Sequence, residues 1–282
     1  MSDANGLVAL ASGGALHVAG PRRGTALLFL HGVGGGAWSW RPQRDAFARD
    51  RRVFVWEARG HGRAAGVRDA GLADYYVDAV EGLTAAVAAV GAPVAVVAHS
   101  MGGLLAFALA CDYPDAVKAL FLIDPVYATG DDAYGHFSPR AGAVARALCA
   151  PLLRSFERDG ILSRLVARWV FMHSFEDRSR MEAAWQHQRR QVPFEYPRML
   201  RESFGRPEGF ALHDFACEIR GPAALVEGSP VGRPRFPALV ATLAERLGPT
   251  FVHATIPGGH YLQLDRPDEV NAGLANFLAR YG

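Results

Sequence analysis

A serine lies at the junction of two apolar segments, in the stretch Val96-Val97-Ala98-His99-Ser100-Met101-Gly102-Gly103. Small residues, Ala98 and Gly102, stand two positions before it and two positions after it. A nucleophilic serine on a sharp strand-to-helix turn requires small residues there, because the backbone passes close to neighbouring segments. The N–H groups and positive end of the following helix would then face the serine oxygen. The pattern predicts a nucleophile for acyl transfer, with a plain helix cap as the alternative.

A histidine follows the last predicted strand, in Ile256-Pro257-Gly258-Gly259-His260. If the strands are parallel, this loop lies at the same edge of the sheet as Ser100, where ligands of open α/β sheets bind. A neutral imidazole there can take the serine proton as a general base. A lone histidine in a loop is more often an ordinary surface residue, but the two signals support each other.

A glycine-rich loop, His31-Gly32-Val33-Gly34-Gly35-Gly36, comes directly after an apolar, strand-like run. Its glycines let the backbone approach a ligand closely, and its N–H groups can help to form an oxyanion hole. We therefore expect this loop, Gly34 included, to line the substrate pocket.

The same loop admits a second interpretation, as a dinucleotide-binding turn. Gly32-x-Gly34-x-x-Ala37 matches the glycine fingerprint, and Glu57 stands where a ribose-binding acid would follow. Trp38 and the residues after it are poorly suited to a tightly packed phosphate-binding helix, and this interpretation leaves the serine and histidine without a role. An NAD-binding protein is therefore the less favoured hypothesis.

Short strand-like segments alternate with helical patterns along the chain. The predicted strands cover 25–30, 52–56, 93–98, 118–123, 222–226 and 251–256, and the predicted helices cover 41–49, 74–90, 101–111, 235–246 and 267–281. The early strands are apolar without alternation, as expected for parallel strands covered on both faces. The pattern predicts an α/β fold with a mostly parallel central sheet flanked by helices.

The alternation stops in the middle of the chain, where the pattern favours amphipathic helices rich in aromatic residues and arginine. We expect 127–214 to form a helical cap, or lid, inserted into a core made of 1–126 and 215–282. Of the cap aromatics, Trp169, Phe171 and Trp185 are candidates for lining the substrate pocket. For any one of them, packing inside the cap is the more common role.

The composition is that of a folded globular protein: 282 residues, 50% hydrophobic and 21% charged, with a formal net charge of +2. This balance gives no reason to expect nucleic acid or an anionic membrane as a partner. No formally charged residue lies from Gly82 to Cys111, but Gly91-Ala92-Pro93 interrupts the run. That interruption predicts a buried helix, strand and second helix rather than a membrane span.

The remaining sequence signals concern cofactors and location. Neither an HExxH metal pattern nor a GxxxxGK[ST] phosphate loop is present, so we expect no metal and no cofactor. The three cysteines are widely spaced, which fits a reducing compartment, and the N-terminus does not resemble a signal peptide. A cytoplasmic protein is therefore expected; the oligomeric state is not predicted.

These motifs together resemble the α/β-hydrolase superfamily over nearly the whole chain. The likeness rests on His31-Gly32, on Arg59-Gly60-His61-Gly62-Arg63, on the turn at Ser100, and on Gly259-His260. The superfamily orders its residues as serine nucleophile, acid and histidine base. The resemblance implies that the backbone N–H groups of Met101 and Val33, with Gly34 as an alternative to Val33, form the oxyanion hole.

The resemblance leaves two candidates for the acid. Most relatives carry it in a G-x-x-D pattern after the seventh strand, where this chain has Gly228-Ser229-Pro230-Val231. Glu227 lies just before that glycine, inside the predicted strand. Asp124 ends the preceding strand, where haloalkane dehalogenases and some ester- or lactone-cleaving relatives place their acid, and the histidine loop also resembles the dehalogenase form. Asp124 is favoured over Glu227, although Asp-Pro can also simply open a turn.

Dehalogenases and epoxide hydrolases carry an aspartate where this chain has Ser100, which favours acyl transfer instead. The sequence therefore predicts a cofactor-free serine hydrolase of a largely apolar, small-molecule carboxylic ester or lactone. A carbon–carbon bond hydrolase, a thioesterase and a hydroxynitrile lyase are alternatives on the same fold. A non-catalytic small-molecule receptor is a further alternative from another class.

Overall fold

The computed structural model describes residues 6–62, 70–126, 218–229 and 234–282. Isolated described positions are Glu176, Ser179, Glu182, Ala183, Gln186 and Gly232. The predicted cap lies almost wholly outside these ranges, so its boundaries stay a prediction.

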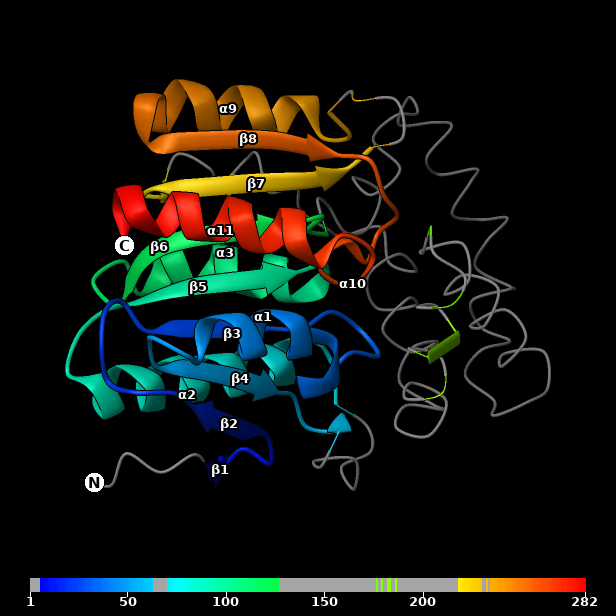
Figure 1. The fold of residues 1–282 in the computed structure, drawn as a ribbon. Coiled ribbons are helices and arrows are strands. Elements are labelled where there is room, and N and C mark those ends of the chain that lie inside the picture. The colour runs from blue at the N-terminus through cyan, green and yellow to red at the C-terminus, as the bar shows by residue number, and fades with distance from the viewer. Residues whose placement is uncertain are drawn as a thin grey trace.

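An eight-stranded sheet with the order β1-β2-β4-β3-β5-β6-β7-β8 forms the centre of the described part (Figure 1). The strands are β1 (Gly6–Ala9), β2 (Ala15–Ala19), β3 (Leu27–Leu30), β4 (Val53–Glu57), β5 (Val94–His99), β6 (Val117–Ile123), β7 (Ala223–Gly228) and β8 (Phe251–Ile256). β3 to β8 pair in parallel, whereas β1 and β2 are antiparallel. The predicted α/β class with a mostly parallel sheet is confirmed.

Helices cover both faces of the sheet. The structure contains α1 (Arg41–Phe47), α2 (Leu72–Val90), α3 (Met101–Asp112), α9 (Pro237–Leu247), α10 (Leu262–Asp265) and α11 (Pro267–Tyr281), with 3-10 turns η1 (Ala37–Trp40) and η5 (Gly248–Thr250). Side chains of α2, α3 and α9 pack in one hydrophobic cluster, and side chains of α1 and α11 pack in another on the opposite face. The five long helices predicted from the sequence are all present, with ends shifted by at most a few residues.

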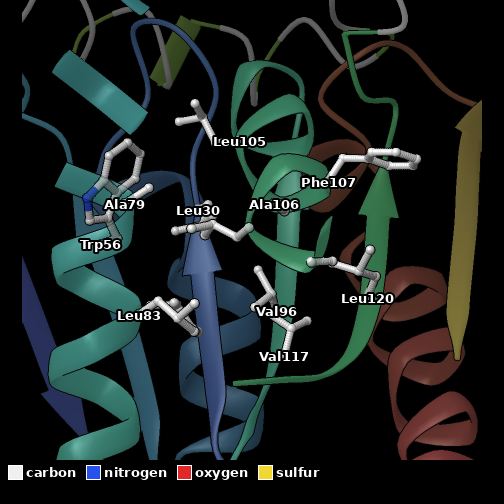
Figure 2. Packing of buried hydrophobic residues seen from close by; sticks show 14 of the residues in the cluster. Leu30, Trp56, Ala79, Leu83, Val96, Leu105, Ala106, Phe107, Val117 and Leu120 are labelled. Carbon is white, nitrogen blue, oxygen red and sulfur yellow. The ribbon is translucent and has the colours of Figure 1, made fainter. Parts of the chain in front are cut away.

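The central strands are apolar throughout because each supplies both clusters. In β3, Leu28 and Leu30 pack with α2 and α3, while Leu27 and Phe29 pack toward α1 and α11. Figure 2 shows Leu30 and Val96 from two neighbouring strands among the side chains of α2 and α3. Successive side chains of a strand point to opposite faces, so burial on both sides removes the polar–apolar alternation.

The antiparallel hairpin β1–β2 at the sheet edge was not predicted from the sequence. All four residues of β1 are exposed, and β2 is buried only at its first two residues. Neither strand forms an apolar run of its own, because the hairpin lies at the edge and covers little of the core. The hairpin pairs through β2 with β4 and thereby extends the sheet beyond the parallel strands.

The uncharged run from Gly82 to Cys111 folds as predicted. It comprises the end of α2, a left-handed cap at Gly91, the buried strand β5 and most of α3. Among the residues that the structure describes, no helix is long and apolar enough to cross a membrane.

The start of α3 packs against the end of β3 at very short range. A Cβ added at Gly102 would lie 2.3 Å from the carbonyl oxygen of Leu30 and 2.7 Å from that of His31. The first atom belongs to a central strand and the second to the residue directly after it, so neither can give way locally. A glycine at this position is therefore a requirement of the fold, which agrees with the predicted need for a small residue after Ser100.

We predict that Gly102→Ala lowers the free energy of unfolding by about 1–3 kcal/mol, because the new methyl group overpacks the β3–α3 contact. Gly273→Ala in α11 is the matched control, since its Cβ would meet only the Phe121 ring, at 3.7 Å. The control should be neutral or stabilising by up to about 1 kcal/mol. Urea unfolding of both variants measures this, and equal effects would contradict the account.

Candidate active site

Three side chains from distant parts of the chain meet at the carboxyl edge of the sheet. Ser100 follows β5, Asp124 follows β6, and His260 lies in the loop between β8 and α10. Ser100 and Asp124 have positive φ angles, 54° and 42°, in the left-handed region that ordinary residues rarely adopt. Such strained backbone is concentrated at functional sites, where the surrounding structure holds it.

The three side chains form one hydrogen-bonded chain. The Ser100 hydroxyl lies 2.9 Å from Nε2 of His260, and Nδ1 of His260 lies 2.6 Å from Oδ2 of Asp124. In the matching tautomer, Nδ1–H donates to the carboxylate and Nε2 accepts the serine proton. The His260 side chain is 30% exposed, whereas that of Asp124 is 1% exposed. The geometry thus places a serine, a histidine and a buried acid within hydrogen-bonding distance, as nucleophilic chemistry requires.

Asp124 has two further partners. Its Oδ1 accepts a hydrogen bond from the backbone N–H of Gly228 at 3.2 Å. Its Oδ2, the oxygen that faces His260, also lies 2.6 Å from Nη1 of Arg235. The carboxylate is therefore held by three donors from separate segments, which fixes its orientation toward the imidazole.

Glu227, the other candidate acid, is occupied elsewhere. It is fully buried in β7, where Oε1 accepts the backbone N–H groups of Arg235 and Phe236, each at 2.9 Å. Its Oε2 lies 2.5 Å from Nε2 of His253 in β8. Glu227 thus anchors the segment before α9, and the geometry favours Asp124 as the acid.

The glycine-rich loop after β3 is shaped by two buried histidines. His31 donates from Nδ1 to the Gly32 carbonyl at 2.7 Å, and His61 accepts the Gly34 N–H at 3.3 Å. The Gly34 N–H is therefore already bound within the protein. Among the described residues, no protein acceptor is present for the N–H groups of Val33 and Met101. The geometry favours Val33 over Gly34 as the second oxyanion donor.

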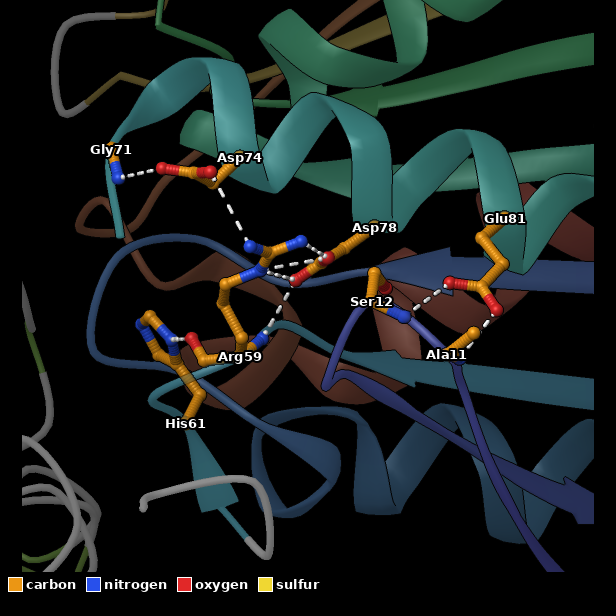
Figure 3. A network of polar contacts seen from close by, with 8 residues as sticks. All are labelled: Ala11, Ser12, Arg59, His61, Gly71, Asp74, Asp78 and Glu81. Atoms are coloured by element: carbon orange, nitrogen blue, oxygen red, sulfur yellow. Dashed lines mark hydrogen bonds and ion pairs between the residues drawn. The ribbon is translucent and has the colours of Figure 1, made fainter. Parts of the chain in front are cut away.

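The loop that carries His61 is tied to α2 by ion pairs (Figure 3). Arg59 forms a bidentate contact with the fully buried Asp78, with the Nη2–Oδ1 distance at 2.6 Å, and a longer one of 3.3 Å with Asp74. The hydrogen bond to Asp78 raises the pKa of the Arg59 guanidinium further above its usual value. The Arg59 carbonyl in turn accepts from Nδ1 of His61, so α2 indirectly positions the Gly34 N–H.

His99, next to the serine, orients the histidine loop. Its Nε2 donates to the backbone carbonyl of His260 at 2.9 Å, and the two rings lie 4.6 Å apart. Burial, reinforced by the nearby His260, lowers the pKa of His99 well below the usual histidine value. His99 is therefore neutral and acts as a hydrogen-bond donor from the core.

The structure gives no support to the dinucleotide interpretation. Glu57, the candidate ribose-binding acid, is buried at the end of β4. Its carboxylate accepts the Ala37 N–H at 2.9 Å and lies 2.8 Å from Nε2 of His17. This acid is bound to neighbouring protein groups, and a short 3-10 turn follows the glycines instead of a long helix.

Several expectations fall outside the part of the chain that the structure describes. Trp169, Phe171 and Trp185 all lie outside it, so their place in the pocket stays a prediction. Within the described ranges, no group of three or more histidine, cysteine or acidic side chains could hold a metal ion.

Three residues near the site were not predicted from the sequence: Arg235, His253 and, in its positioning role, His99. Arg235 contacts Asp124 across 111 positions of the chain, and no local pattern signals such a pair. The His253–Glu227 contact depends on the register of two adjacent strands, β7 and β8. His99 was part of the recognised serine motif, but its long-range bond to the His260 carbonyl has no signature in the sequence.

A parallel sheet that carries a serine, an acid and a histidine beyond the carboxyl ends of its strands is the arrangement of the α/β hydrolases. A family model described as "Alpha/beta hydrolase family" matches residues 27–272, and the chain belongs to that family. It is therefore a member of a hydrolase enzyme family, and the resemblance inferred from the sequence is confirmed.

Sequence relatives carry several hydrolase activities. The chain is 28% identical over 271 residues to a putative carbamate hydrolase, RutD, of Variovorax paradoxus, which covers 93% of this chain and 95% of that protein. It is 30% identical over 154 residues to the (E)-2-((N-methylformamido)methylene)succinate hydrolase of Acinetobacter baylyi, covering 52% of this chain and 57% of that protein.

Among solved structures, the enol-lactonase from Burkholderia xenovorans LB400 matches with a TM-score of 0.71 and 19% identity, covering 97% of this chain and 100% of that one. A thermophilic esterase from Thermogutta terrifontis matches with a TM-score of 0.74 and 19% identity, covering 99% of both chains. At this level of identity, these matches establish the shared fold.

The buried histidines make the free energy of unfolding depend on pH. Burial lowers the pKa of His31, and it lowers the pKa of His61 to about 3, helped by the adjacent His31. Unfolded, each histidine titrates near 6.5, so the unfolded chain binds more protons below that pH. The contribution of these neutral histidines to the free energy of unfolding is complete above pH 6.5. It is lost as the pH falls below that value, toward about 3 in the case of His61.

We predict that the free energy of unfolding falls between pH 7 and pH 5, with each such histidine contributing up to about 1.4 kcal/mol per pH unit. His61→Gln, whose side-chain oxygen can still accept the Gly34 N–H, should remove the contribution of one histidine from this slope. Urea titrations at several pH values measure it. A flat dependence, or an unchanged slope in the variant, would contradict the account.

Proposed function

We propose that this protein is a cofactor-free serine hydrolase that cleaves a carboxylic ester or lactone through an acyl-enzyme. The observation that carries the proposal is the chain Ser100–His260–Asp124, with donor–acceptor distances of 2.9 and 2.6 Å. Serine oxygen is a weak nucleophile by itself and requires a base within hydrogen-bonding reach. We expect a small-molecule substrate, with Trp169, Phe171 and Trp185 of the predicted cap as candidates for lining its pocket.

In the acylation step, Ser100 Oγ attacks the substrate carbonyl carbon while its proton moves to Nε2 of His260. Asp124 holds the imidazole by Nδ1–H and stabilises the imidazolium that forms. The N–H groups of Val33 and Met101 stabilise the tetrahedral oxyanion. The bond to the leaving alcohol then breaks, and the alkoxide oxygen takes the proton from Nε2.

Deacylation uses the same groups with water in place of the alcohol. His260 takes a proton from water, the hydroxyl oxygen attacks the acyl carbon, and the bond to Ser100 Oγ breaks as the proton returns to the serine. The products are a carboxylic acid and free enzyme. A lactone gives a hydroxy acid by the same route, because acid and alcohol remain in one molecule.

A carbamate ester is the second candidate substrate class. It is supported by the relative named as a putative carbamate hydrolase, because that likeness extends over 93% of this chain. The same nucleophile, base and oxyanion donors serve a carbamate carbonyl. A panel of esters, lactones and carbamates of increasing chain length distinguishes the classes, since a sharp optimum defines the pocket.

We predict that Ser100→Ala lowers kcat/KM for p-nitrophenyl ester hydrolysis by a factor on the order of 10³ or more, because the nucleophile is lost. The rate of p-nitrophenolate release measures it, with circular dichroism to verify folding. Near-normal activity in a folded variant would overturn the covalent mechanism.

We predict that Asp124→Asn lowers kcat by a factor on the order of 10³, because an amide cannot stabilise the imidazolium. Glu227→Gln is the matched control: it makes the same carboxylate-to-amide change in a buried side chain that does not contact His260. It should lose much less kcat and act mainly on stability. The reverse order of the two effects would assign the acid to Glu227.

A further inference from the structure

The acid of the site has a second cationic partner besides the histidine. Nη1 of Arg235 lies 2.6 Å from Oδ2 of Asp124, the same oxygen that lies 2.6 Å from Nδ1 of His260. The Asp124 side chain is 1% exposed and the Arg235 side chain is 45% exposed, so the guanidinium reaches the acid from the solvent side. One buried carboxylate oxygen therefore serves two donors.

Arg235 is held in this position by its own backbone. Its N–H donates to the buried Glu227 carboxylate, which also accepts the N–H of Phe236. Pro237 begins α9 directly afterwards. Glu227 itself is fixed in β7 and bound to His253, so the segment carrying Arg235 is tied to the sheet at two successive residues. The ion pair is therefore made by a side chain whose backbone is anchored to the sheet.

We propose that Arg235 is a positioning residue that shares the acid with His260 and sets the pH below which the site loses activity. This inference rests on the proposed function, in which neutral His260 is the base. A guanidinium stays protonated at every relevant pH, so its charge is constant. Protonation of His260 would place a second cation on the same carboxylate oxygen, and the repulsion between the two cations disfavours it.

Two effects on catalysis follow from this arrangement. Without the guanidinium, the Asp124 oxygen would pair with the imidazolium alone, so we expect the acidic limit of activity to move to higher pH. The same repulsion weakens the stabilisation of the imidazolium in the transition state. Arg235 therefore extends activity toward acidic pH and limits the maximal rate. Because it is half exposed, solvent screens it, and we expect a shift of about one pH unit.

Other groups around His260 are accounted for among the described residues. His99, from β5, is neutral and donates to the His260 carbonyl, and the Tyr261 ring lies edge-on at 5.6 Å. Asp265, from α10, accepts the N–H of Gly259 at 3.2 Å, which places a second carboxylate near the loop. The test variants retain both His99 and Asp265, so the comparison isolates the change at Arg235.

The test compares wild type with Arg235→Gln and Arg235→Lys. The rate constant for modification of Ser100 by a fluorophosphonate is measured across pH 4 to 9, since this reaction requires neutral His260 and no knowledge of the substrate. For Arg235→Gln, we expect the acidic limb of this pH–rate profile to move to higher pH by about one unit. The rate constant on the plateau should be equal or higher. Arg235→Lys retains the cation and should stay near wild type.

Arg280→Gln is the matched control, because it removes one exposed arginine of the last helix. The Arg280 guanidinium donates to the Pro249 carbonyl at 3.4 Å. The acidic limb of the pH–rate profile should not move in this variant. An unmoved or lowered limb in Arg235→Gln, or a rate reduced equally at all pH values, would overturn the proposal, because a purely structural role gives these results.

A wild-type protein that is not modified at any pH would instead contradict the proposed function. The inference about Arg235 is then decided by NMR. The ring-proton signal of His260 is assigned as the one that disappears in His260→Gln. The midpoint of that titration should rise by about one pH unit in Arg235→Gln. An unchanged midpoint would refute the inference independently of any catalysis.

Discussion

The close packing of α3 on β3 is the constraint on which the site depends. Only a residue without a Cβ fits at Gly102, because an added Cβ would lie 2.3 Å from the carbonyl oxygen of Leu30. This contact holds the strained turn at Ser100 directly beside the loop that begins at Gly32. A Cβ at Gly32 would itself lie 2.8 Å from the Ser100 Cβ. The proposed nucleophile and the proposed oxyanion donors are therefore brought together by backbone packing.

Two kinds of polar group, neutral and charged, surround this turn. Neutral, buried histidines hold the backbone: His31 and His61 shape the glycine loop, and His99 holds the carbonyl of His260. Charged groups then surround the acid and its support. Asp124 is shared between His260 and Arg235, and Glu227 holds the backbone of Arg235. Neutral groups thus set the geometry, and paired charges set the electrostatics of the proposed base.

Much of the core architecture could be predicted from the sequence, because strands buried on both faces and helices with one apolar face leave clear patterns. β8 and α11 were predicted with their observed bounds. The β1–β2 hairpin was missed because its exposed edge strand carries no such pattern. The positions of Ser100 and His260 followed from the turn that each occupies after a parallel strand. Arg235 could not be predicted, because its contact depends on the segment before α9 returning to the end of β6.

Covalent modification is the sharpest test of whether Ser100 is a nucleophile activated by His260. The protein is treated with a fluorophosphonate at neutral pH, and the adduct is located by peptide mass spectrometry. We expect one phosphonyl group per chain, on the peptide that contains Ser100, and a strongly reduced rate of modification in His260→Gln. Absence of an adduct, or an adduct located on another residue, would contradict it.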